Sequence, residues 1–140
     1  MVNDDGNIVE AEKMPSTDRD ILDMLTAYTN ERHTSGLEDQ LPPNHAVLEF
    51  VRSSPQMGVK SSFTFGQGYG GLKMALTAAR IPYIEVTPQK WQGAMSCRTK
   101  GDKNITKSLA QQMFPSIKVT HAIADALLIA EFCRRQWVKR

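Results

Sequence analysis

The amino-acid sequence predicts an α/β fold, because two short strand patterns alternate with longer helical patterns. The first strand pattern is AVLEFV at residues 46–51, and the second covers residues 83–87. Apolar side chains at helical spacing occupy three further segments, which are residues 61–80, residues 103–114 and the stretch that begins at about Thr120.

Residues 1–45, which precede the first of these strands, predict a turn, a strand, a helix and a loop in that order. Gly6 is a turn signal, and residues 8–14 follow as a short, partly exposed strand. Ser16 or Thr17 then caps a helix with an acidic first turn, which the helix dipole favours. The apolar spacing of this helix fades before a polar loop at residues 35–44.

The remaining elements follow from composition and spacing. Residues 46–51 are apolar on both faces, which is typical of a strand inside a sheet. Residues 61–80 predict a helix despite their glycines, and Pro82 separates this helix from the strand at residues 83–87. Asp102 begins the next helix. The apolar stripe expected on the 61–80 helix is Leu72, Met74, Ala75, Leu76 and Ala79.

Composition limits the class of protein. The chain has 140 residues, 41% of them hydrophobic and 23% charged, which fits a single soluble domain over residues 1–140. No apolar run approaches the roughly 18 residues that cross a bilayer, so we expect no membrane partner. The acidic N-terminus lacks the features of a signal peptide, and Cys97 and Cys133 form neither a disulfide framework nor a zinc pattern. These features predict a reduced, cytoplasmic setting.

Charge is distributed unevenly along the chain. Residues 1–86 contain 7 Lys/Arg and 12 Asp/Glu, a balance of −5, whereas residues 87–140 contain 10 Lys/Arg and 3 Asp/Glu, a balance of +7. A basic half favours a polyanionic partner, most simply nucleic acid. The alternative is a basic C-terminal tail that only keeps the protein in solution.

Glu49 is the most informative residue in the sequence. It lies within an otherwise apolar strand, where a carboxylate is costly unless it is paired or holds a cation. Arg52 could pair with it, or this end of the strand could be exposed. Because packing does not require an acid at this position, we favour a functional role.

His121 and Asp125 are four residues apart in the last helix, so they share one face near its start. Taken alone, Asp125 could be an acid favoured by the helix dipole and His121 a surface residue. With Glu49 they supply two carboxylates and an imidazole from separate elements. That donor set suits a divalent-metal nuclease, in which Mg²⁺ is held by carboxylates, water and substrate phosphate.

Two further groups of residues suit contact with nucleic acid. Phe63 and Phe65 stand among small and polar residues, where aromatic rings can stack on bases, although they could instead form the core stripe of their helix. At least one of the two rings should point outward, because the residues are two apart. Lys60 and Ser61 adjoin them, and the candidate phosphate contacts further along are Arg98, Lys100, Lys103 and Lys107.

A glycine pattern offers a different function. Gly66, Gly68 and Gly71 match G-x-G-x-x-G, with Glu85 further on, as in dinucleotide-binding enzymes. The preceding residues KSSFTF do not predict a buried strand, and Glu85 follows too soon. We therefore rank a nicotinamide-dependent enzyme third, after a nuclease and a nucleic-acid-binding protein without catalysis.

Several segments in order resemble RuvC-like Holliday junction resolvases, and most of all their compact variant in phages and prophages. These are AVLEFV, GVKSSFTFGQGYGG, IPYIEVTPQKWQ, KGDK, MFP and HAIADALLIA. The resemblance implies an RNase H-like fold, in which helices flank a mixed five-stranded sheet, and an assembly that is often a homodimer. It also implies an endonuclease that cleaves branched DNA such as four-way junctions with Mg²⁺, or with Mn²⁺ in its place, in a bacterial or phage-infected cell.

The same resemblance assigns roles to individual residues. Glu49 matches the acid on the fourth strand and Asp125 the acid on the final helix, while His121 occupies the metal-site position of the HxxxD pattern. Phe63 and Phe65 fall in the segment that enters the junction. Lys90 and Lys103 fall where the family places basic residues near the scissile strand.

The sequence departs from the family at its start. The family opens with a strand bearing G-I-D-P-G, whose Asp is a metal ligand, whereas Asp4 and Asp5 match only the turn after the second strand. The first strand and most of the second are therefore expected to be missing, which predicts an N-terminally shortened chain. Unless residues 1–15 rearrange or a partner supplies a strand, this chain should be poorly folded and weakly active or inactive. The main alternative function follows, namely a junction-binding protein that has lost catalysis.

Overall fold

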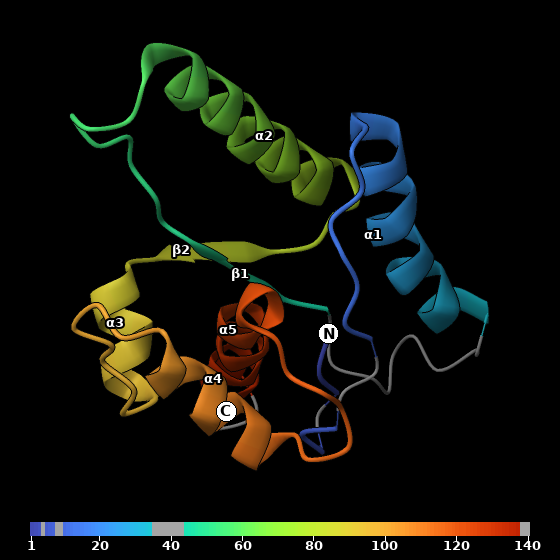
Figure 1. Cartoon of the computed structure of the whole chain (residues 1–140). Helices are drawn as coiled ribbons and strands as arrows, with labels where there is room; N and C mark the ends of the chain where they lie inside the picture. Colours follow the sequence, from blue (N-terminus) through green and yellow to red (C-terminus); the bar gives the residue numbers. More distant parts are fainter. Residues whose placement is uncertain (4, 8–9, 35–43, 138–140) are drawn as a thin grey trace. The chain divides into compact units, whose positions relative to one another are not determined.

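The computed structural model describes residues 1–3, 5–7, 10–34 and 44–137. Strands and helices alternate from α1 to α3, and two more helices follow, which agrees with the predicted α/β class (Figure 1). In order, the elements are α1 (Asp18–Thr34), β1 (Ala46–Glu49), α2 (Val59–Ala78), β2 (Tyr83–Val86), α3 (Pro88–Ala94), α4 (Asn104–Met113) and α5 (His121–Trp137).

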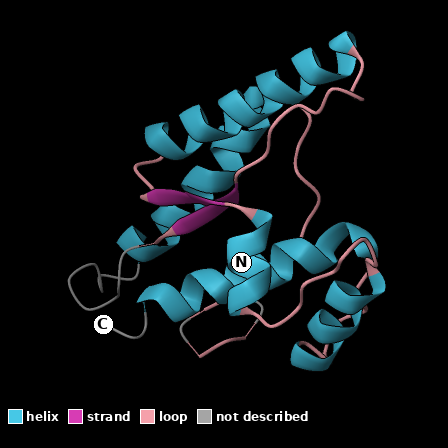
Figure 2. Ribbon diagram, turned by 90° about the vertical axis from the view of Figure 1, so that its left-hand side faces the viewer, coloured by secondary structure: helices cyan, strands magenta, loops and turns pink. Residues whose placement is uncertain are grey.

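The two strands form a parallel pair (Figure 2). The Ala46 N–H donates to the Pro82 carbonyl at 2.9 Å, and the Phe50 N–H donates to the Val86 carbonyl at 2.7 Å. From the first bond to the second, both strands advance in the same direction and by the same number of residues, which is the pattern of parallel pairing. Since α2 lies between them in the chain, β1, α2 and β2 form a βαβ unit. The antiparallel part of the expected mixed sheet is not among the described strands.

The N-terminal turn is confirmed, but the strand predicted after it is not. The Asn3 N–H donates to the Asn7 carbonyl at 2.9 Å, and Gly6 takes the left-handed conformation with φ 85°. Residues 8 and 9 lie outside the described residues, and residues 10–14 form no strand. Side chains 10–14 are all exposed, so this segment has no apolar face to bury against a neighbour.

The chain divides into two compact units, which are described separately. The first unit comprises Met1–Glu12, Val47–Phe50 and Ile84–Arg140, and the second comprises Lys13–Ala46 and Val51–Tyr83.

In the second unit α1 packs against α2. Thr17 is the cap of α1, because its hydroxyl accepts the Asp20 N–H at 3.1 Å and donates to the Asp20 carboxylate at 2.7 Å. The helices approach closely at Gly71, where a Cβ would stand 3.1 Å from the Asp18 carboxylate. The buried side chains are Ile21, Leu25, Ala75, Leu76 and Ile81. Met74 was expected in this core, but it is 67% exposed.

The first unit contains the main hydrophobic core, with α4 packed on α5. The short helix α3 was not predicted, although Thr87 caps it and Pro88 begins it. As expected, Asp102 starts α4, because its carboxylate accepts the Asn104 N–H at 2.9 Å. The core side chains include Val86, Trp91, Met95, Cys97, Phe114, Leu127, Leu128 and Phe132.

A buried carboxylate near the end of α5 is held by two arginines of the same helix. Glu131 is 3% exposed and accepts hydrogen bonds from Arg134 at 2.7 and 2.8 Å and from Arg135 at 2.7 Å. The Arg134 guanidinium lies beside Gly6, at 3.5 Å from where a Cβ would stand. Burial raises the pKa of Glu131, but the arginine bonds and charges outweigh it and hold the pKa below its ordinary value.

No helix in the described part of the chain is long and apolar enough to cross a bilayer.

Candidate functional site

The Glu49 carboxylate stands at the end of β1 and is held by a tryptophan from a distant part of the sequence. The indole N–H of Trp91 donates to Glu49 Oε1 at 3.0 Å. Trp91 is 0% exposed, whereas Glu49 is partly exposed. The acid in the apolar strand is thus bound by a neutral donor, the indole N–H of Trp91.

The order of the elements explains how Trp91 reaches Glu49. β2 runs beside β1 and passes directly into α3. Thr87 caps α3 by accepting the Lys90 N–H, and the Trp91 carbonyl accepts the Met95 N–H at 2.9 Å. The backbone of α3 is therefore fixed at both ends. This fixes the position of the buried Trp91 ring and of its N–H donor.

The two candidate residues of α5 differ in exposure. His121 is exposed at the first residue of the helix, and Asp125, one turn later, is partly buried. Asp125 lies near enough to Cys97 to influence it: burial raises the pKa of the Cys97 thiol, and the Asp125 charge raises it further. Burial also raises the pKa of Cys133 to about 11. Neither cysteine is therefore a thiolate nucleophile near neutral pH.

The donor set suits a divalent cation that is shared with a substrate. Within the described residues, no group of three or more His, Cys, Asp or Glu side chains could hold a metal ion by itself. Mg²⁺ usually binds one or two carboxylates and completes its shell with water and phosphate oxygens. Glu49 and Asp125 can supply such carboxylates, because both are partly exposed and come from elements packed on one core.

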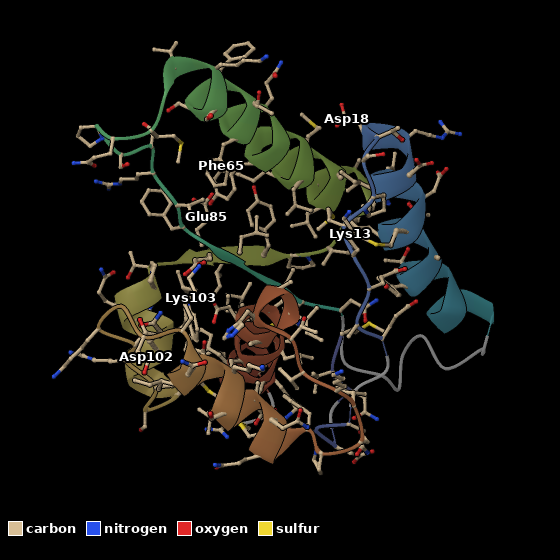
Figure 3. The ribbon with its side chains drawn as sticks, in the orientation of Figure 1. Lys13, Asp18, Phe65, Glu85, Asp102 and Lys103 are labelled. Carbon is tan, nitrogen blue, oxygen red and sulfur yellow. The ribbon has the colours of Figure 1, made fainter. Side chains whose placement is uncertain are left out.

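The candidate phosphate contacts of the first unit are open to solvent. Lys90, Arg98, Lys100 and Lys103 are exposed, and Lys107 is partly exposed. Arg98 lies over Gly93, where a Cβ would stand 3.2 Å from the guanidinium. Lys103 and Asp102 mark the start of α4 in Figure 3.

The aromatic candidates of the second unit lie at the N-terminal half of α2 (Figure 3 labels Phe65). Phe63 is 67% exposed and Phe65 43% exposed, so neither ring belongs to the buried core of this unit. Lys60 and Ser61, one turn earlier, are exposed as well. The expectation that at least one ring faces outward is confirmed.

The same helix removes the dinucleotide interpretation. Gly66, Gly68 and Gly71 all lie inside α2, whereas a phosphate-binding glycine motif occupies the turn between a strand and a helix. The backbone N–H groups at these glycines are within a helix and cannot cradle a pyrophosphate.

Solved structures supply the comparison that decides the fold. Thermus thermophilus RuvC is 16% identical with a TM-score of 0.53, covering 94% of this chain and 78% of that protein. T. thermophilus RuvC in complex with a Holliday junction substrate is 17% identical with a TM-score of 0.51, covering 91% and 78%. The chain has a RuvC-like fold. Searches of protein-family profiles and of curated proteins give no match.

The similarity to these RuvC structures agrees with the RuvC-like fold expected from the resemblance. The structure also places beside Glu49 a residue that the sequence did not suggest. Trp91 contacts Glu49, although 42 positions separate them. The available signal was the Thr-Pro start of a helix directly after the second strand, which would have placed Trp91 in a short helix beside the sheet.

Proposed function

We propose that the chain is a single-domain, structure-selective DNA endonuclease that cleaves branched DNA such as Holliday junctions. It depends on Mg²⁺, with Mn²⁺ as a substitute, and represents the compact phage-type variant of RuvC-like resolvases. The observation that supports this most strongly is Glu49, a carboxylate held in place at the end of a strand in a protein with a RuvC-like fold. The RuvC–Holliday junction complex among the similar structures supports the substrate class.

In this proposal one group of residues binds the metal ions and two others contact the DNA. Glu49 and Asp125 provide hard oxygen ligands, and His121 is a third ligand or handles a proton nearby. Divalent cations held by these residues would supply the activation of water and the stabilisation of the departing 3′ oxygen. The phosphate contacts are Lys90, Arg98, Lys100, Lys103 and Lys107, while Lys60, Ser61, Phe63 and Phe65 hold unpaired bases and backbone near the branch point.

The test is cleavage of an end-labelled four-way junction in Mg²⁺ by the parent chain and by Glu49→Gln and Asp125→Asn. Each substitution keeps the size of the side chain and removes its charge, so we expect cleavage to fall at least about 100-fold, the scale seen when a directly acting group is removed. Glu85→Gln is the matched control, because it neutralises a carboxylate on the neighbouring strand. Equal cleavage by Glu49→Gln and the parent would contradict the proposal.

A second function, junction binding without catalysis, is favoured by one observation: the candidate basic and aromatic contacts include exposed side chains such as Lys60, Phe63 and Phe65. A junction-binding protein without catalysis needs the basic and aromatic residues but not the acids. It would bind the junction in Mg²⁺ without cutting it, and Glu49→Gln would leave binding unchanged. Binding without cleavage therefore decides for this alternative.

A further inference from the structure

We propose that Trp91 is a positioning residue for Glu49, holding one carboxylate oxygen so that the other is presented to a divalent cation. This inference rests on the proposed function, and it names a part of the site that the ligand residues alone do not include.

The hydrogen bond is placed where it can position the acid. Trp91 Nε1 lies 3.0 Å from Glu49 Oε1, and the indole is completely buried while the carboxylate is partly exposed. A buried indole N–H needs an acceptor, so the ring cannot give up Glu49 without leaving its donor unsatisfied. The buried Trp91 ring therefore fixes the position of the more flexible Glu49 side chain.

The donor type is suited to a metal ligand. An arginine or lysine in the same place would neutralise the carboxylate and compete with a cation. The indole N–H carries no charge to cancel that of a carboxylate, and it engages one of the two Glu49 oxygens, Oε1. Outer-shell donors of this kind orient ligating carboxylates, and their loss typically lowers metal affinity or activity by about 10–100-fold.

The purely structural interpretation is that Glu49 exists to satisfy Trp91. Two conservative variants separate these roles. Glu49→Gln keeps an oxygen acceptor for the indole but removes the charge, whereas Trp91→Phe keeps the charge but removes the donor. Trp137→Phe is the matched control, since it removes the other tryptophan of the chain.

The primary experiment measures Mn²⁺ binding to the full chain by the electron paramagnetic resonance signal of free Mn²⁺, without DNA and without catalysis. We expect Trp91→Phe to raise the Kd about 10-fold and Glu49→Gln to raise it at least as much. Trp137→Phe should leave the Kd unchanged. In the ¹⁵N-labelled parent, Mg²⁺ should shift the indole signal of Trp91 and leave that of Trp137 in place.

The outcomes distinguish this inference from the proposed function. If Glu49→Gln weakens Mn²⁺ binding and Trp91→Phe does not, the positioning role is wrong and the metal site stands. If Glu49→Gln has no effect, or the parent binds no Mn²⁺, the positioning role is overturned, whereas the proposed function stands or falls with the junction cleavage assay. Trp91 is a core residue, so a β-benzothienylalanine replacement, which keeps the ring shape but has sulfur in place of N–H, decides the matter if Trp91→Phe unfolds. Parent-like Mn²⁺ affinity in that variant would refute the positioning role.

Discussion

Replacing Glu131 with glutamine tests whether a buried charge cluster holds the end of α5. The carboxylate is 3% exposed and accepts three arginine hydrogen bonds, two from Arg134 and one from Arg135. Glutamine has one acceptor oxygen in place of two, and its NH₂ group would face a guanidinium donor. The substitution therefore removes the charge and at least one of the bonds, because Oε1 accepts two of them and Oε2 accepts the third.

The size of the effect follows from these contacts. Hydrogen bonds to charged groups contribute about 1.5–3 kcal/mol each, and removing one partner of a buried ion pair costs about 3–5 kcal/mol. The Arg134 and Arg135 side chains are 25% and 42% exposed, so water can solvate them once the charge is gone. We therefore expect the free energy of unfolding to fall by about 3 kcal/mol, and the Tm by about 10 °C.

Urea unfolding followed by circular dichroism at pH 7 measures this difference. Asp23→Asn is the matched control, because it breaks an ion pair with Arg19 whose side chains are 81% and 62% exposed. Its cost should be less than about 0.5 kcal/mol. If Glu131→Gln unfolds within about 1 kcal/mol of the parent, the cluster does not stabilise the fold as argued.

Three further predictions follow from other contacts. Folding lowers the pKa of Glu131, so its ionised carboxylate contributes fully to stability above the pKa of the unfolded chain, and this contribution is lost as the pH falls through the pKa of the folded chain. The difference in free energy of unfolding between the parent and Glu131→Gln should therefore narrow below pH 4.5. Urea titrations at successive pH values would measure it. Gly6→Ala should lower the free energy of unfolding by about 1–2 kcal/mol, because φ is 85° there; an unchanged urea midpoint would contradict this. Phe63→Ala should weaken junction binding about 10-fold in a gel-shift titration, while Met74→Ala, equally exposed on the same helix, should not; equal effects would argue against base stacking.

Most of the fold could be predicted because its longer elements have clear periodic patterns. The helices α1, α2, α4 and α5 and both strands were expected within a few residues of their observed bounds. The short helix α3 was missed, since seven residues are too few to show a periodic apolar stripe and Trp91 is its one buried side chain. The expected strand at residues 8–14 failed at residues 10–14, where the side chains are exposed.

The site could be predicted only in part. Glu49 was identifiable because an acid in an apolar strand is costly without a partner. The identity of that partner could not be predicted, since Trp91 is 42 residues away and the contact depends on how α3 follows β2. The roles of His121 and Asp125 rest on their spacing and on the resemblance, and they remain predictions.

The glycines of α2 leave the protein room for engineering. A Cβ at Gly66, Gly68 or Gly70 would meet open space, and each exposed glycine makes a helix about 1 kcal/mol less stable than alanine would. Alanine at all three positions should therefore strengthen α2 by about 2–3 kcal/mol. Under the proposed function, the bare backbone at these glycines would let DNA approach the helix closely. A thermostable variant built this way would trade resistance to heat against binding.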